Sequence, residues 1–186
     1  MKLMIASDLH GDAACTAALL QQFDSSGAAR LILLGDLLYH GPRNDLPAGY
    51  APKEVIRLLN ERRNDLLCVR GNCDTEVDQM VLSFPILSDS AYIAAGTRTF
   101  LATHGHRDGE SAPPPLRPGE ILLCGHTHVP AARTMDCGNL YVNPGSVSIP
   151  KENSPKSYLL FDSEQDTLSF RTLEGEEYRR VALSTL

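Results

Sequence analysis

The amino-acid sequence predicts an α/β fold, and three observations support this prediction. Apolar runs with the length of buried strands alternate with helical periodicity along the first third of the chain. Shorter apolar runs separated by turn residues, which are typical of strands, fill most of the second half. Several of these runs end in a polar cluster beside a glycine, which is where open α/β sheets build their sites.

The first third of the chain has the pattern strand, helix, strand, helix, strand. The expected elements are a strand over 2–7, a helix over 13–24, a strand over 30–35, a helix over 52–63 and a strand over 65–70. Asp12 can cap the first of these helices, and Pro52 suits the first turn of the second. Such an order favours parallel strands joined by right-handed crossovers.

The second half predicts further strands with tight connections. They are expected over 91–95, 98–103, 120–124, 131–136, 139–142, 157–162 and 167–172. Turn signals such as Cys137-Gly138-Asn139 favour a largely antiparallel arrangement here. The residues after Glu174 fit a strand or a helix equally well. With 186 residues, no internal repeat and no linker, residues 1–186 are expected to form a single domain.

Composition and charge narrow the class of protein. The net charge of −6 argues against an extended nucleic-acid surface. No apolar run approaches the ~18 residues that a membrane span needs, and the N-terminus shows no signal-peptide pattern. The five cysteines are odd in number and form no C-x-x-C pair, which suits a reducing compartment. A cytoplasmic protein without membrane or extended nucleic-acid partners is therefore expected.

The polar clusters supply seven candidate metal ligands. They are Asp8, His10, Asp36, Asn72, His104, His126 and His128. Asp8 and His10 are two residues apart at a strand end, so in extended chain both side chains point to the same side. Carboxylate, amide and imidazole groups bind divalent ions, and a carboxylate can bridge two of them. Seven ligands are enough for two metals, which makes a dinuclear centre the expected site.

The motifs D-x-H, G-D, G-N-x-D, H-G-H and G-H-x-H, in this order, resemble the calcineurin-like metallophosphoesterase superfamily. Three further segments, Gly71–Asp74, His40–Asn44 and Asn143–Ser146, look more narrowly like the small bacterial and archaeal phosphodiesterases typified by YfcE. The resemblance implies a four-layer α-β-β-α sandwich with two mixed β-sheets. It also implies a homologous metal site.

The resemblance implies how the ligands are shared between two metals. Asp8, His10, Asp36 and His128 would hold one metal, and Asp36, Asn72, His104 and His126 the other. A hydroxide between the metals would attack phosphorus in line while the metals stabilise the developing charge. The oxygen and nitrogen ligand set and the family favour Mn²⁺, although Zn²⁺, Fe²⁺ or Ni²⁺ would also fit.

The sequence departs from the superfamily at Cys73, where the common motif has a histidine that helps to protonate the leaving oxygen. A thiol is a poor acid for this purpose at neutral pH. We therefore expect leaving-group protonation to be weak or to come from His40 or His106. His40 could equally be a loop residue with a satisfied hydrogen bond, and His106 could instead orient a ligand or bind metal directly. Arg43 is expected to contact a substrate phosphate or to be solvated.

Asn72, His104, Cys73, His40 and Arg43 are accordingly the candidate catalytic residues. Asp74 is expected to buttress the loop that carries Asn72, and Asn143–Ser146 to form a turn that supports the site.

The predicted function is a metal-dependent phosphodiesterase that hydrolyses a small phosphodiester. A phosphomonoesterase or nucleotide phosphatase with the same metal core is the first alternative, which Cys73 mildly disfavours. A non-catalytic scaffold resembling the retromer subunit is the second, and the complete ligand set disfavours it. A nuclease is a third alternative, disfavoured by the acidic charge and the lack of a basic or aromatic track. Because such relatives are often homo-oligomers, a homo-oligomer remains open.

Overall fold

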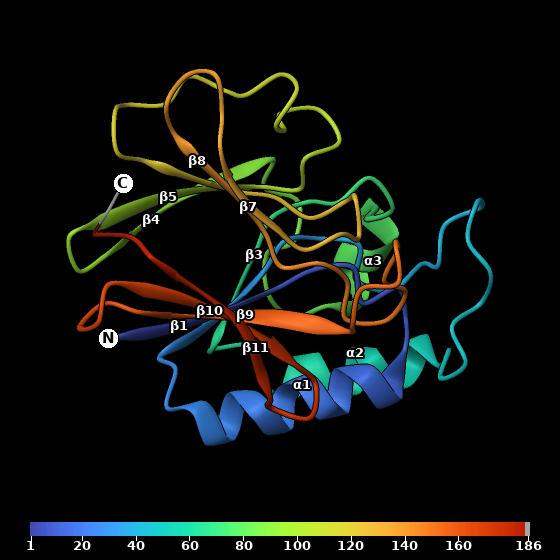
Figure 1. Cartoon of the computed structure of the whole chain (residues 1–186). Coiled ribbons are helices and arrows are strands. Elements are labelled where there is room, and N and C mark those ends of the chain that lie inside the picture. Colours follow the sequence, from blue (N-terminus) through green and yellow to red (C-terminus); the bar gives the residue numbers. More distant parts are fainter. Residues whose placement is uncertain (185–186) are drawn as a thin grey trace.

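The computed structural model describes residues 1–184, which form two β-sheets and three helices (Figure 1). The elements are β1 (Lys2–Ala6), α1 (Ala13–Ser26), β2 (Arg30–Leu33), α2 (Pro52–Glu61), β3 (Leu66–Cys68), α3 (Glu76–Val81), β4 (Ser90–Ala95), β5 (Arg98–Thr103), β6 (Ile121–Leu123), β7 (Ala131–Thr134), β8 (Leu140–Asn143), β9 (Ser157–Asp162), β10 (Thr167–Thr172) and β11 (Glu177–Ala182). The first sheet has the strand order β11-β10-β9-β1-β2-β3, and the second β4-β5-β6-β8-β7. Both sheets are mixed, which confirms the predicted fold class.

The first third folds as predicted. β1, β2 and β3 are parallel neighbours, and α1 and α2 lie side by side along one face of their sheet (Figure 1). The Asp12 side chain accepts a hydrogen bond from the Cys15 N–H at 3.0 Å and caps α1. Gly27 ends this helix with a φ of 69°, a left-handed conformation that glycine adopts without strain. Pro52 stands at the start of α2, as expected.

The strands of the second half pair largely antiparallel, as expected, but the centre of the second sheet is an exception. Its central strands β5, β6 and β8 are parallel, and only the outer pairs β4·β5 and β7·β8 are antiparallel. The long segment 104–120 carries the chain back to the start of the sheet before β6, and so forms a crossover between the parallel strands β5 and β6. The ambiguous stretch after Glu174 forms β11 at the edge of the first sheet.

The helix α3 was not predicted. It is six residues long, too short for an apolar periodicity to stand out, and it has no buried residue. A capping box at Thr75 starts it: the Asp78 N–H donates to the Thr75 hydroxyl, and the Asp78 carboxylate accepts from the Thr75 N–H at 2.7 Å.

The core has one layer between the two sheets and one between the first sheet and its helices. Leu159 and Phe161 of β9 lie fully buried in the layer between the sheets. There the Phe161 ring meets that of Phe100 from β5 edge to face, with centroids 4.9 Å apart. A smaller cluster that includes Leu101 and Tyr141 covers the other face of the second sheet. Among residues 1–184 no helix is both long enough and apolar enough to cross a membrane.

Candidate metal centre

The predicted ligands meet where the strands of both sheets end. Asp8 and His10 follow β1, Asp36 follows β2, and Asn72 follows β3. His104 follows β5, and the His126 and His128 pair follows β6. Parallel strands bring their carboxyl ends to one edge, and the packing of the two sheets brings the two edges together. Five of these seven side chains are buried, a rare state for charged and polar groups without partners.

The backbone is strained at five of the candidate ligands. Asp8, His10, Asp36, His126 and His128 all have positive φ, between 46° and 66°. Residues other than glycine rarely adopt this left-handed conformation, and such outliers gather at functional sites.

One group of ligand atoms is formed by Asp8, His10 and His128. The Nε2 atom of His128 lies 3.2 Å from Oδ1 of Asp8, and Nε2 of His10 lies 3.6 Å from the same oxygen. The two Nε2 atoms are 3.3 Å apart. Together with Asp8, these atoms form one of the groups whose geometry could hold a metal ion.

A second group lies next to the first around Asp36. The His104 Nε2 is 3.4 Å from Oδ2 of Asp36 and 3.0 Å from Oδ1 of Asn72. His10 Nε2 approaches the same Asp36 oxygen at 3.7 Å, so this carboxylate faces both groups. The His126 ring lies 5.1 Å from that of His104, centroid to centroid, and is half-buried. Asp36 therefore lies between the two groups.

Three imidazoles are oriented by the main chain. The Nδ1–H groups of His10, His104 and His128 donate to the carbonyl oxygens of Tyr39, Leu34 and Ile149, at 2.7, 2.6 and 2.8 Å. A carbonyl oxygen only accepts, so each neutral ring must carry its proton on Nδ1 and present the Nε2 lone pair to the centre. Lone pairs and carboxylate oxygens then face one another.

The close packing of these groups shifts their pKa values. Burial would raise the pKa of Asp8, but His10 and His128 more than offset it and hold the pKa well below its ordinary value. Burial would lower the pKa of His104, yet the carboxylates of Asp36 and Asp8 raise it to about 9. Burial and then the Asp36 carboxylate raise the pKa of the Cys73 thiol to about 12. The cluster thus attracts positive charge.

Asp74 holds the strand ends together, as predicted. Its carboxylate accepts hydrogen bonds from the N–H groups of Asp36, Leu37 and Gly71, at 2.8, 2.9 and 2.7 Å. Asp36 in turn accepts from the Cys73 N–H at 2.8 Å. The loops after β2 and β3 therefore form one hydrogen-bonded unit.

The segment Asn143–Ser146 supports the opposite side. The Asn143 amide donates to the carbonyl of Gly125 at 2.7 Å, and the Ser146 hydroxyl donates to the carbonyl of Asp8 at 2.9 Å. Ser148, which sequence reasoning did not single out, donates to the same Asp8 carbonyl at 2.9 Å.

A cavity of about 410 Å³ opens over the centre. Its lining includes Asp36, Asn72 and the histidines His10, His126 and His128. Arg43 lines it too, as does Lys151, and neither side chain has a hydrogen bond or ion pair among residues 1–184. Sequence reasoning missed Lys151 because no local motif surrounds it. The His128 carbonyl accepts from its N–H at 3.1 Å, a contact that only the folded chain makes.

Two other predicted residues lie beside the cavity. The His40 ring packs edge-on between Tyr39 and Tyr50, with centroid distances of 4.7 and 5.4 Å, and its buried Nδ1 has no hydrogen-bond partner. His106 lies 5.4 Å from His104 between ring centroids, and its Nδ1 is likewise buried and unpartnered. Both imidazoles are close to the centre but outside its ligand groups.

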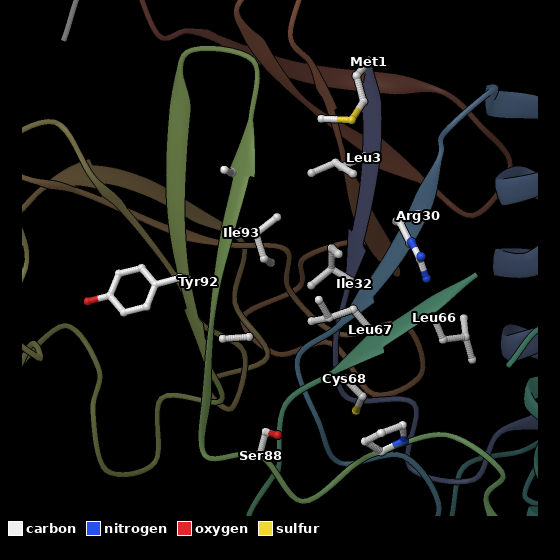
Figure 2. Close-up of a pocket in the computed structure, with 13 residues that line it drawn as sticks. Met1, Leu3, Arg30, Ile32, Leu66, Leu67, Cys68, Ser88, Tyr92 and Ile93 are labelled. Atoms are coloured by element: carbon white, nitrogen blue, oxygen red, sulfur yellow. The ribbon is translucent and has the colours of Figure 1, made fainter. Parts of the chain in front are cut away.

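A larger cavity, of about 580 Å³, lies away from these groups. It opens between the sheet edges at β3 and β4, where Leu3, Ile32 and Ile93 face inward and the exposed Tyr92 points away (Figure 2). Its lining is mostly apolar and contains no carboxylate or imidazole. We place the functional site in the smaller cavity because only there do polar groups converge.

Comparison with known proteins agrees with this geometry. Phosphodiesterase YfcE of Escherichia coli (strain K12) is 47% identical over 177 residues, covering 95% of this chain and 94% of that protein. The probable metallophosphoesterase YsnB of Bacillus subtilis (strain 168) is 25% identical over 178 residues, covering 92% and 89%. A solved structure of the E. coli YfcE phosphoesterase matches with a TM-score of 0.93 at 45% identity and covers 98% of this chain and 100% of that one.

The family model described as the calcineurin-like phosphoesterase superfamily domain matches residues 1–166. The resemblance inferred from the motifs and the fold that it implied are thus confirmed. The chain belongs to the calcineurin-like phosphoesterase superfamily and is a homologue of phosphodiesterase YfcE.

Proposed function

We propose that the protein is a phosphodiesterase that hydrolyses small phosphodiesters at a centre of two divalent metals. The observation that carries the proposal is the convergence of carboxylate, amide and imidazole atoms at the bottom of a cavity with free cationic side chains on its wall. The 47% identity to phosphodiesterase YfcE supports the diester preference.

The residues present fit metal ions. Oδ1 of Asp8 is buried without a hydrogen-bond partner, and the Nε2 atoms of His10 and His128 face each other at 3.3 Å. Acceptors that meet without a donor cost free energy unless a proton or a metal cation lies among them. Both groups combine carboxylate oxygen with imidazole nitrogen, a donor set that Mn²⁺ accepts and that Zn²⁺, Fe²⁺ and Ni²⁺ also tolerate.

We assign the ligands as follows. Asp8, His10, Asp36 and His128 would hold one metal; Asp36, Asn72, His104 and His126 would hold the other. Bound metals would lower the pKa of a water molecule and offset negative charge on the phosphoryl oxygens.

The remaining roles belong to side chains on the cavity wall. Arg43 and Lys151 carry unpaired positive charge and would bind the phosphoryl oxygens that do not react. Asn72 would orient the phosphate from the cavity wall, and His104 would act from behind it, because its Nε2 lies 3.0 Å from the Asn72 Oδ1. Cys73, buried and with its raised pKa, would donate no proton to the leaving alcohol. Leaving groups that need no protonation would then react best.

The test is hydrolysis by metal-stripped protein of bis-p-nitrophenyl phosphate and of p-nitrophenyl phosphate, with and without added Mn²⁺. We expect turnover only with metal and a clear preference for the diester. A preference for the monoester would instead identify a phosphomonoesterase with the same metal core. Bound metal without turnover of either ester would indicate a non-catalytic scaffold instead of an enzyme.

A further inference from the structure

A second, apolar groove adjoins the candidate metal centre. It has a volume of about 360 Å³ and lies beside α2 and α3. Its walls include Tyr39, Tyr50, Ile56, Val77 and Val81. Cys73 lines this groove and also the cavity over the metal centre, so the two spaces meet at its side chain.

The groove collects apolar side chains that the fold leaves in water. Val77 is 68% exposed, Val81 43% and Tyr39 41%, and all three line the groove. Single exposed apolar residues are ordinary, but a contiguous set beside a polar site indicates a binding surface. Val77 and Val81 do not contribute to the core, because α3 has no buried residue.

Polar contacts keep α3 in place over the groove. The Gln79 amide donates to the carbonyls of Leu82 and Phe84 at 3.0 and 2.9 Å, and its oxygen accepts from the Ile86 N–H at 2.9 Å. Asn60 of α2 donates to the Val81 carbonyl at 2.9 Å. The Asn60 bond joins α2 to α3, and the Gln79 bonds fix the chain that follows α3. None of them uses the apolar face, so the groove exists before anything binds.

We propose that this groove binds the apolar or aromatic ester group of the substrate whose phosphate lies at the metal centre. The inference rests on the proposed function and names its substrate class. A phosphodiester carries an anionic phosphate and an organic group one bond apart. The two adjoining spaces match these two parts of the substrate. The polar cavity has Arg43 and Lys151 on its wall for the phosphate, and the groove beyond Cys73 has apolar walls for the organic group. Small diesters with aromatic substituents would therefore be preferred over methyl esters.

The test measures binding by calorimetry with metal-loaded protein and three phosphonates. Methylphosphonate offers only the anionic head, whereas phenylphosphonate and 2-phenylethylphosphonate add an aromatic group with a short and a longer reach. Phosphonates are not hydrolysed, so binding is separated from catalysis. We expect the better aromatic ligand to bind about tenfold more tightly than methylphosphonate, from apolar area removed from water.

A double variant on the exposed surface of α3 tests the contribution of the groove to binding. Val77→Ser with Val81→Ser should cut the aromatic preference to about threefold or less and leave methylphosphonate binding unchanged. Met80→Ser is the matched control, because Met80 lies on the same helix, is 84% exposed and does not line the groove. It should leave all three affinities unchanged. Helical circular dichroism and the urea midpoint check that α3 is retained.

The outcomes separate this inference from the proposed function. Equal binding of all three phosphonates would overturn the groove assignment and leave the metal centre intact. An aromatic preference that survives in the double variant would also overturn it. Failure of methylphosphonate itself to bind metal-loaded protein would overturn the proposed function and the groove assignment with it.

Discussion

At the scale of the residue, the centre is defined by which atom each side chain presents. The main-chain carbonyls of Tyr39, Leu34 and Ile149 bind the Nδ1–H groups of three histidines, which leaves every Nε2 directed at the carboxylates. Asp36 lies between the two ligand groups and approaches both His10 and His104.

Replacing the shared carboxylate tests its role. Asp36→Asn keeps the volume and the hydrogen bond from the Cys73 N–H but removes the charge, so we expect lower metal content and a rate reduced by more than about 100-fold. Metal analysis and diester hydrolysis measure these two effects, and a urea curve checks that the fold is retained. Asp24→Asn, at an exposed ion pair with Arg62, is the control and should behave like wild type. Wild-type activity in Asp36→Asn would refute the bridging role.

The thiol at position 73 predicts how the rate depends on the leaving group. Without a nearby acid, the rate should fall steeply as the leaving alcohol becomes more basic. A series of methyl aryl phosphodiesters measures this slope. Cys73→Ser should keep the same slope, because neither group protonates the leaving oxygen at neutral pH. A flat dependence in the wild type would mean that another acid, such as His40 or His106, supplies the proton.

At the scale of the element, the loops after the strands are packed against one another rather than against solvent. Gly35 and Gly71 approach so closely that a Cβ on either would overlap the backbone or side chain of the neighbouring loop. Asp74 then joins the same two loops by three hydrogen bonds. The spacing of Asp36 and Asn72 therefore depends on a contact between loops and not on either strand alone.

A single methyl group should disturb that contact. In Gly71→Ala the Cβ would lie 2.9 Å from Cγ of Asp36, so we expect a loss of about 2–3 kcal/mol of unfolding free energy and weaker metal binding. Urea unfolding and metal titration measure the two effects. Gly138→Ala is the control: its Cβ meets nothing within 4 Å, so its left-handed backbone should cost stability without changing metal affinity. Equal metal affinity in both variants would contradict the role of the loop contact.

At the scale of the whole molecule, two sheets packed face to face bring distant segments into one centre. Phe100 and Phe161 lie in the layer between the sheets, far along the chain from each other. The first sheet contributes Asp8, His10 and Asp36, and the second contributes the histidines after β5 and β6. A ligand that binds at this junction should stabilise the packing of both sheets.

Metal should therefore raise the thermal stability of the whole chain. At a free metal concentration of 100 times Kd, binding to the native state alone adds about 2.7 kcal/mol. For a chain of this size that corresponds to a Tm higher by about 5–10 °C. Scanning calorimetry of stripped and Mn²⁺-loaded protein measures the shift, and Asp36→Asn should reduce it. An unchanged Tm in the wild type under saturating metal would speak against a centre that joins the two sheets.

The sequence by itself determined the α/β class, the parallel first third and the seven candidate ligands. These features are local: strands show as apolar runs, and each ligand lies in a short motif at a strand end. Local patterns could not show that β5, β6 and β8 are parallel, because pairing depends on the path of the segment 104–120. The helix α3 was not predicted for a similar reason, because a cap and side-chain hydrogen bonds hold it in place and no apolar face is buried.

Only the tertiary structure decided how these parts make a site. Which ring nitrogen faces the centre depends on carbonyls far along the chain, as His104 and Leu34 show. The position of Lys151 and the meeting of two cavities at Cys73 arise from contacts between segments that share no sequence pattern. The chain thus encodes the chemistry of the ligands locally, whereas long-range packing sets their spacing, because the contacts that hold them are formed only when the sheets have closed on each other.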